Sequence, residues 1–389
     1  MKHVILKPGK EKAIRNHHHW IFSGAVAQLP HFIDGECLTV SSSNGDILGW
    51  GYFNRKAKII GRMLSFEDMP VKEAIQRHLQ SALLMRQHLF AGQPTNAYRL
   101  VNGEGDLLPG LIVDRYNDVL VIQISTLGMK LLRDDIVAWL NQALNPRCIY
   151  EKSLLPSRKE EGLSDEQGIL FGELPANEIE INENGLKFFV SILHGQKTGF
   201  FLDHRDMRQM VKGSVAGKRV LNCFAYTGGF SVYAAAGGAI KTDSVDISAS
   251  AMQMAEKNMA LNGFKSSDHQ FFAADVFEFL REKPLDYDFI ILDPPAFAKR
   301  QKDIVAACRG YKDINRLAIQ KMPKGAMLLT SSCSYHVDEA LFQTVVFQAA
   351  VEARRTVKII GRHRMAGDHP INICHRESDY LKSLLLYIG

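Results

Sequence analysis

The 389-residue sequence lacks a signal peptide and a run of residues suited to cross a membrane. At its amino terminus only three apolar residues stand together before Lys7, which is too few for a secretory signal. The longest charge-free run that we tested as a span, residues 220–240, contains four glycines, and it favours a strand, a loop and a helix over a helix in lipid. We therefore expect a cytoplasmic protein that does not enter a membrane.

Paired cysteines and a strong excess of one charge are also missing. None of the six cysteines stands in a Cys-x-x-Cys pair, which disfavours a zinc ribbon or a thioredoxin-like site and is typical of free thiols in a reducing compartment. The 47 Lys and Arg residues against 42 Asp and Glu residues leave a net charge of +5, which permits a polyanionic partner without requiring one. Charged residues at 23% and apolar residues at 46% exclude a disordered or coiled-coil chain.

The length predicts two or three domains, at about 150 residues each. Short alternating apolar runs between turn residues predict a small β-rich barrel or sandwich in residues 1–70. Residues 71–185 predict an α+β unit, with helical periods over 71–91 and near 128–143 and a hairpin around 182–185. Its expected strands are 98–101, 110–114, 119–124 and 148–150.

Strands and helices alternate through the last part of the chain, which predicts an α/β fold with a parallel sheet in residues 186–389. A helix over 248–262 has Ser248 as its N-cap and Gly263 as its stop. The expected strands are 219–224, 241–246, 269–274, 287–293, 325–331, 356–361 and 380–387.

The first of these strands leads through a glycine turn, Thr227-Gly228-Gly229, into a helix, and Asp246 ends the next strand 18 residues after Gly228. This pattern is how a Rossmann-like sheet holds a nucleoside, because the glycines admit the ligand and the carboxylate accepts from its ribose. The signature Gly-x-Gly-x-x-Gly is missing, so a ligand without phosphates, such as S-adenosylmethionine, is favoured. Asp275 ends the third strand, where it would accept from the adenine amino group.

Asp293 follows the fourth strand and Cys333 follows the fifth, so neighbouring strands would deliver both side chains to one edge of the sheet. This pair suits methyl transfer to C5 of cytosine, which is a poor nucleophile. A thiolate added to C6 turns the ring into an enamine whose C5 attacks the sulfonium methyl group. A carboxyl group at N3 would stabilise the charge that develops on the ring.

Long blocks of sequence resemble the bacterial 23S rRNA large-subunit methyltransferase I family, which makes 5-methylcytosine. The blocks are residues 15–26, 108–115, 194–205, 222–230, 293–297, 308–315 and 332–334. The resemblance implies an N-terminal PUA-like domain, a small α+β middle domain and a C-terminal class I methyltransferase domain. It also implies that Cys333 is the nucleophile and that 23S ribosomal RNA is the substrate. The wider RNA cytosine-C5 group often has a second cysteine after the Asp-Pro loop, where this chain has Pro295 and Ala296.

These motifs and strand ends together predict two sets of binding residues. Those expected at S-adenosylmethionine are Lys197, Thr198, Asn222, Phe224, Thr227, Gly228, Gly229, Asp246, Ile247, Asp275, Val276 and Asp293. Those expected to grip RNA phosphates are Lys7, Lys10, Lys12, Arg15, Arg55 and Lys56, with Lys58 and Arg62 beside them.

His17, His18 and His19 stand in a row before Trp20. With no cysteine nearby and no acid at ligand spacing, we expect no metal site there. We expect His19 and Trp20 to serve packing.

Two other functions stay open. The Asp-Pro-Pro loop also resembles the loop with which amino-group methyltransferases of adenine or guanine hold an amine, and those enzymes need no thiol. A non-enzymatic RNA-binding factor that senses S-adenosylmethionine would bind the cofactor without turnover. The target nucleotide, the assembly stage of the substrate, the base that removes the C5 proton and a possible homodimer are likewise open.

Overall fold

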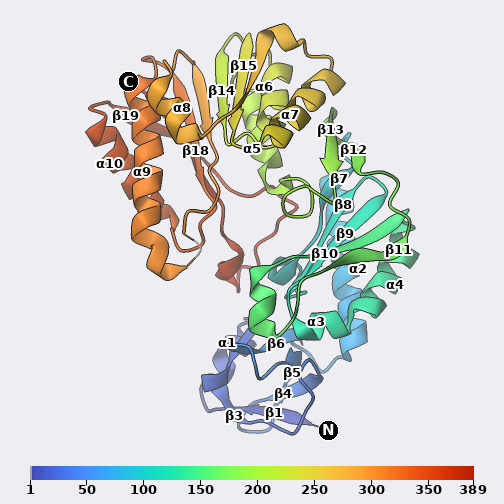
Figure 1. Ribbon diagram of the computed structural model, residues 1–389. Helices are drawn as coiled ribbons and strands as arrows, with labels where there is room; N and C mark the ends of the chain where they lie inside the picture. The colour runs from blue at the N-terminus through green and yellow to red at the C-terminus, as the bar shows by residue number, and fades with distance from the viewer. Residues whose placement is uncertain (1, 299) are drawn as a thin grey trace. The chain divides into compact units, whose positions relative to one another are not determined.

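The computed structural model describes residues 2–298 and 300–389, which form two compact units (Figure 1). Unit 1 comprises Met1–Asn184, Val190–Leu202 and Gly367–Ser378. Unit 2 comprises Gly185–Phe189, Asp203–Ala366 and Asp379–Gly389. No helix in the described ranges is both long and apolar enough to span a lipid bilayer. The predicted domain boundaries near residues 70 and 185 stay predictions.

The first sheet of unit 1 confirms the expected β-rich amino-terminal fold. Its strand order is β2-β6-β5-β4-β1-β3, and all neighbours are antiparallel except β1 and β4. The strands are β1 (His3–Leu6), β2 (Trp20–Phe22), β3 (Val26–Gln28), β4 (Cys37–Ser41), β5 (Ile47–Phe53) and β6 (Ile59–Ser65), with helix α1 (Glu11–Arg15) after β1. Strands β5 and β6 approach each other closely at Gly49, whose φ is +133°. Only glycine fits there, because a Cβ would lie 2.1 Å from the Ser65 carbonyl oxygen.

The second sheet of unit 1 has the order β11-β10-β9-β8-β7, and only β9 and β10 run parallel. Its strands are β7 (Ala97–Asn102), β8 (Leu111–Tyr116), β9 (Val119–Ile124), β10 (Cys148–Ser153) and β11 (Glu166–Gly172). Helix α2 (Val71–Leu89) buries Ile75, Leu79 and Leu83, as its period predicts. The single helix expected near 128–143 is wrong in detail, because it forms as two, α3 (Leu127–Leu131) and α4 (Arg133–Leu144).

Strands β12 (Glu178–Glu183) and β13 (Leu186–Ser191) flank the expected hairpin turn. Asn184 has φ 53° and Gly185 has φ 83°. Two successive left-handed residues, Asn then Gly, are the requirement of a type I′ turn, which matches the twist of the strands it joins.

Unit 2 is built on a seven-stranded sheet with the order β16-β15-β14-β17-β18-β20-β19. The strands are β14 (Arg219–Cys223), β15 (Lys241–Asp246), β16 (His269–Ala273), β17 (Phe289–Leu292), β18 (Met327–Ser332), β19 (Val357–His363) and β20 (Lys382–Ile388). The helices are α5 (Arg205–Lys212), α6 (Gly229–Ala236), α7 (Ala249–Leu261), α8 (Val276–Glu282), α9 (Ile304–Lys321) and α10 (Glu339–Glu352). Single turns of 3-10 helix complete both units: Ser23–Ala25, Gly103–Asp106, Pro156–Glu161, Leu202–His204, Ser266–Asp268, Gln301–Asp303 and Arg376–Ser378.

The expected parallel direction is confirmed for five neighbouring strands and wrong for β20, whereas β19 at the edge again runs in the direction of the five. Strand β20 enters between β18 and β19 and runs antiparallel to both. Successive residues of β14 explain why this sheet needs helices on both faces. Leu221 packs in the core with α8, α9 and α10, whereas Val220 packs in the core with α5 and α6.

Candidate active site

The glycine turn after β14 has a backbone that few side chains tolerate. Phe224 has φ 59°, Tyr226 has φ 47° and Gly228 has φ 77°, all in the left-handed region. A Cβ on Gly228 would lie 2.8 Å from the Cβ of Ala255 in α7. Strained positions of this kind persist where the surrounding structure holds them, and they gather at ligand sites.

Asp246, at the end of β15, holds this turn in place. Its two carboxylate oxygens accept from the backbone N–H groups of Tyr226, at 2.9 Å, and Ser248, at 3.0 Å. A carboxylate offers about four acceptor positions, so Asp246 retains capacity for ribose hydroxyls. Beside it Ile247 is 76% exposed, which leaves an apolar side chain available to cover a ligand.

Two buried polar atoms at the end of β14 have no hydrogen-bond partner within the described ranges. Asn222 donates to the Ser231 hydroxyl at 2.9 Å, but its Oδ1 accepts no hydrogen bond, and the hydroxyl of Thr227 is equally unpartnered. Leaving such atoms unsatisfied is unfavourable, so they fit a polar ligand above the glycine turn.

Asp275 is the N-cap of α8, because its carboxylate accepts from the backbone N–H of Glu278 at 3.1 Å. This capping bond leaves its second oxygen for an adenine amino group. The next residue, Val276, is only 3% exposed and packs in the core, so its backbone is the part able to meet a ligand.

Lys197 and Thr198 belong to unit 1, whereas the ten other predicted cofactor residues belong to unit 2. The buried Thr198 hydroxyl donates to the Asp114 carboxylate at 2.6 Å and lies 2.8 Å from the hydroxyl of Tyr116. The amine of Lys197 lies 4.3 Å from the ring centre of Phe201.

The loops that carry Asp293 and Cys333 meet at one edge of the sheet, as the sequence predicts. They leave adjacent parallel strands, in which Leu292 pairs with Thr330. The Cys333 sulfur lies 3.8 Å from the Pro294 carbonyl oxygen, and the next residue, Ser334, accepts from the backbone N–H of Ala298 at 3.1 Å.

Two residues that sequence reasoning missed lie at these loops. The Nδ1 atom of His204 is 3.5 Å from a carboxylate oxygen of Asp293. The amine of Lys382, in β20, donates to the Ser334 carbonyl oxygen at 2.7 Å and interacts electrostatically with Cys333. Burial lowers the pKa of Lys382 below its ordinary value. His204 lies in the block 194–205, which the resemblance includes. No local sequence pattern indicates Lys382, because its role depends on the pairing of β20 with β18.

All but one of the basic residues predicted at the RNA are exposed, namely Lys7, Lys10, Lys12, Arg15, Arg55, Lys56 and Lys58. Arg15 pairs with Asp46 at 2.6 Å and Arg55 pairs with Asp34 at 2.9 Å. Lys7 donates to the Gly24 carbonyl oxygen at 3.0 Å. For Lys10, Lys12, Lys56 and Lys58 no ion pair occurs among the described side chains, so these amines are available to phosphates.

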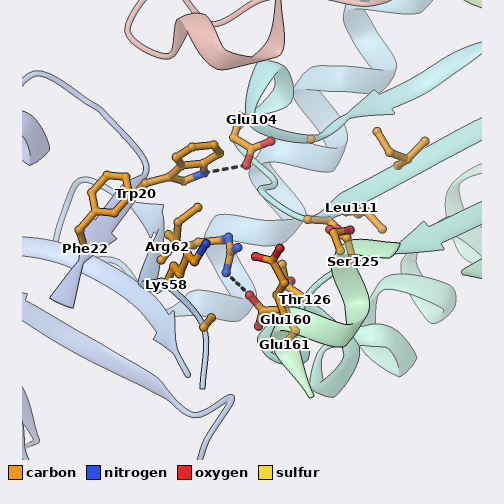
Figure 2. A pocket seen from close by; sticks show the side chains of 16 residues that line it. Trp20, Phe22, Lys58, Arg62, Glu104, Leu111, Ser125, Thr126, Glu160 and Glu161 are labelled. Carbon is orange, nitrogen blue, oxygen red and sulfur yellow. Dashed lines mark hydrogen bonds and ion pairs between the residues drawn. The ribbon is translucent and has the colours of Figure 1, made fainter. Parts of the chain in front are cut away.

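Arg62 corrects the expectation that the basic residues around Lys56 form one exposed group. Its side chain is only 12% exposed and its Nη1 lies 2.6 Å from an oxygen of the buried Glu161. The pair borders a pocket of about 440 Å³ in unit 1 (Figure 2). Trp20 and Phe22 also line this pocket, and the Trp20 indole donates to Glu104 at 2.9 Å. The Arg62 guanidinium is therefore held by an internal ion pair, unlike the exposed basic residues near it in the sequence.

Comparison with known proteins agrees with this architecture. Residues 164–362 match the model of the S-adenosylmethionine-dependent methyltransferases, and residues 4–66 match that of the PUA-like domains. Proteins named ribosomal RNA large subunit methyltransferase I from Shewanella denitrificans and Aeromonas salmonicida are each 42% identical, over 98% of this chain and 98% of theirs.

Solved structures show the same fold from end to end. A provisionally named SAM-dependent methyltransferase from Streptococcus mutans is 26% identical with a TM-score of 0.84, over 99% of this chain and 100% of its own. A second methyltransferase structure, complexed with S-adenosylhomocysteine, has the same identity and coverage and a TM-score of 0.86. The orphaned polar atoms, the glycine turn and the strand-end acids fit that class of cofactor. The chain belongs to the ribosomal RNA large subunit methyltransferase I family, and its carboxyl-terminal part is an S-adenosylmethionine-dependent methyltransferase domain.

Proposed function

We propose that this protein transfers a methyl group from S-adenosylmethionine to C5 of a cytosine in 23S ribosomal RNA, in the cytoplasm, through a covalent adduct with Cys333. The observation that carries the proposal is the meeting of the Cys333 and Asp293 loops at the carboxyl edge of the sheet that also bears the glycine turn. The names of the relatives support ribosomal RNA of the large subunit as the substrate.

The cofactor-binding part of the proposal rests on side chains of unit 2. Asp246 would accept from the ribose hydroxyls, and Asp275 from the adenine amino group. The unpartnered atoms of Asn222 and Thr227 would bind polar groups of the amino-acid end, and Ile247 would cover the adenine. When bound, the cofactor supplies an electrophilic methyl group.

The chemical steps follow from what each group can do. The Cys333 thiolate adds to C6 of the cytosine, and the carboxyl group of Asp293 donates to N3, where negative charge develops. C5 would then take the methyl group, with S-adenosylhomocysteine as the leaving group. The C5 proton passes to a base or to water, and the electron pair of that C–H bond re-forms the C5=C6 bond and expels the Cys333 thiolate. The amine of Lys382, which interacts electrostatically with Cys333, would stabilise the negative charge of the thiolate.

RNA binding is proposed for the amino-terminal basic face. Lys10, Lys12 and Lys56 would contact phosphates, since their charges are not neutralised by described acids. Lys7, Arg15 and Arg55 would add to this face by exchanging a local partner for a phosphate. The target cytosine must be unstacked, because a stacked base offers neither face to a thiolate.

The proposal is tested with ribosomal RNA that carries 5-fluorocytosine. The wild-type protein should form a covalent complex, because fluorine cannot leave as a proton does, and Cys333→Ala should form none while still binding S-adenosylmethionine. Cys37→Ala, which removes another half-buried thiol, is the matched control and should trap normally. Methylation that persists in Cys333→Ala would instead support the amino-group alternative, and cofactor binding with no methylation by the wild type would support a sensor.

A further inference from the structure

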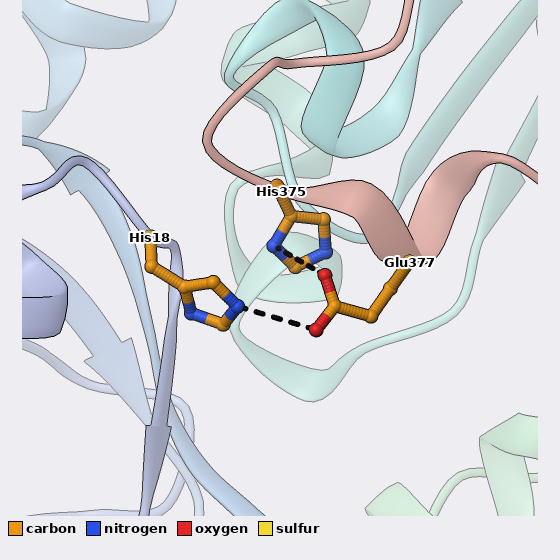
Figure 3. Close-up of side chains that lie close together, drawn as sticks. All are labelled: His18, His375 and Glu377. Atoms are coloured by element: carbon orange, nitrogen blue, oxygen red, sulfur yellow. Dashed lines mark hydrogen bonds and ion pairs between the residues drawn. The ribbon is translucent and has the colours of Figure 1, made fainter.

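Three side chains from opposite ends of the chain meet in unit 1 (Figure 3). His18 precedes β2, whereas His375 and Glu377 lie in the segment Gly367–Ser378. Glu377 is 359 positions after His18 in the sequence. The His18 Nε2 atom is 3.4 Å from one oxygen of Glu377, and His375 Nδ1 is 3.6 Å from the other. One ligand atom from each residue lies within 4.8 Å of the other two.

The imidazole of His375 is the feature that requires an explanation. It is only 1% exposed, and neither ring nitrogen has a hydrogen-bond partner among the residues that the structure describes. A buried polar atom with no partner is unfavourable, and here both nitrogens of one ring are in that state.

The distances suit a shared cation better than direct hydrogen bonds. Two ligands held at about 2.0–2.1 Å from one tetrahedral ion lie roughly 3.3 Å apart. The separations of 3.4 and 3.6 Å are close to that value, and the second is too long for a hydrogen bond. The ligand atoms of His18 and His375 lie within 4.8 Å of each other, so the two rings are near enough to share one ion after local adjustment.

We propose that His18, His375 and Glu377 bind a divalent transition-metal ion of the Zn²⁺ type, with water as the fourth ligand. Two neutral imidazoles and one carboxylate are a donor set that Zn²⁺ prefers over Ca²⁺ or Mg²⁺, which take oxygen ligands. Because the ligands come from both ends of the chain, the ion would fasten the segment Gly367–Ser378 to the amino-terminal sheet.

The His18 ring must change its proton position on binding. Its Nδ1 accepts from the Trp20 backbone N–H at 3.2 Å, so the neutral ring carries its proton on Nε2, which faces Glu377. Ion binding at Nε2 requires the neutral tautomer that carries its proton on Nδ1, so the hydrogen bond from the Trp20 backbone N–H is lost. The alternative to a metal site is therefore a simple His18–Glu377 hydrogen bond, which the experiment distinguishes.

The test uses the full-length protein after treatment with a chelator. Zn²⁺ titration in a calorimeter, and Co²⁺ titration followed by the visible absorption of tetrahedral cobalt, should each give one ion per chain. His375→Gln and Glu377→Gln should each weaken binding at least roughly 10–100-fold, the loss typical even of outer-shell changes. His17→Gln, which alters a neighbouring exposed histidine, and Cys374→Ser, which removes an exposed thiol, are matched controls and should bind as the wild type does.

Thermal unfolding gives a readout that does not depend on methylation. Zn²⁺ should raise the Tm of the wild type and of both controls, because it binds only the folded chain, and should not raise that of Glu377→Gln. Glu377 is 31% exposed and the change is conservative, so this variant should fold even if His375→Gln does not. Absence of stoichiometric binding by the wild type, or equal affinity in Glu377→Gln, would overturn the site in favour of the hydrogen bond.

Discussion

The hydroxyl of Ser334 accepts a hydrogen bond from the backbone N–H of Ala298 at 3.1 Å, and it also lies 2.9 Å from the hydroxyl of Tyr311. Ser334 follows the proposed nucleophile directly, and Ala298 ends the Asp-Pro-Pro loop. One buried hydroxyl therefore fixes the separation of the two loops on which methyl transfer is proposed to depend. Ser334 is a positioning residue in this account, because it acts through Cys333 and Asp293.

Ser334→Ala should lower kcat roughly fivefold and leave the affinity for S-adenosylmethionine unchanged, because one hydrogen bond of about 1 kcal/mol is lost between the loops. Steady-state methylation and calorimetry measure the two quantities. Ser331→Ala is the matched control, since that buried hydroxyl pairs instead with Ser383 at 2.8 Å. An unchanged kcat in Ser334→Ala, or an equal loss in the control, would contradict the positioning role.

Asp246→Ala should weaken binding of S-adenosylmethionine by about 1–3 kcal/mol, because both the ribose acceptor and the bonds that hold Tyr226 and Ser248 are removed. Calorimetric titration measures the change. Asp286→Ala removes an exposed carboxylate before β17 and serves as the comparison. Equal affinities for the two variants would rule out the assignment of Asp246.

Gly228→Ala and Gly263→Ala form a matched pair, because both glycines have φ +77°. Either change should cost about 1–2 kcal/mol of folding free energy through the left-handed backbone. Only the first places a Cβ against Ala255, at 2.8 Å, whereas nothing lies within 4 Å at Gly263. Urea unfolding should therefore show a larger loss for Gly228→Ala, accompanied by weaker cofactor binding. Equal losses would show that the turn relaxes without affecting α7.

Arg62→Gln should reduce the free energy of unfolding by about 3–5 kcal/mol, because it leaves the Glu161 carboxylate buried without its partner. Arg15→Gln breaks an ion pair whose side chains are more than half exposed, so its effect should stay below about 1 kcal/mol. Denaturant titration separates the two. A small effect at Arg62 would indicate that water reaches Glu161 once the guanidinium is removed.

Lys10→Gln combined with Lys12→Gln should weaken RNA binding and reduce its dependence on salt, because fewer counterions are released on binding. Binding measured at several salt concentrations gives the slope, and Lys72→Gln, an exposed lysine on α2, is the control. These substitutions test the basic face better than deletion of the first 70 residues would. That deletion would remove both Arg62 and Asn54, which bond the buried Glu161. An unchanged slope in the double variant would exclude these lysines from the RNA interface.

The sequence by itself determined most of the elements and the order of the site motifs. Strand β17 is a short apolar run, and helix α7 is bounded by a serine cap and a glycine stop, so local preferences place them. The same holds for Asp246, Asp275 and Asp293, because a parallel sheet brings every strand's carboxyl end to one edge. Their contact with the cofactor stays a prediction.

Only the tertiary structure decided which distant residues meet. The antiparallel entry of β20 beside β18 brings Lys382 to Cys333, and no local pattern specifies strand direction. The charge of Arg62 looks like surface in the sequence, yet the fold buries it against Glu161. The sequence near His18 contains no acid at ligand spacing, whereas in the structure Glu377, from the other end of the chain, lies beside it. Such contacts depend on how sheets and segments pack in three dimensions, whereas sequence periodicity reports only which face of its own element a residue occupies.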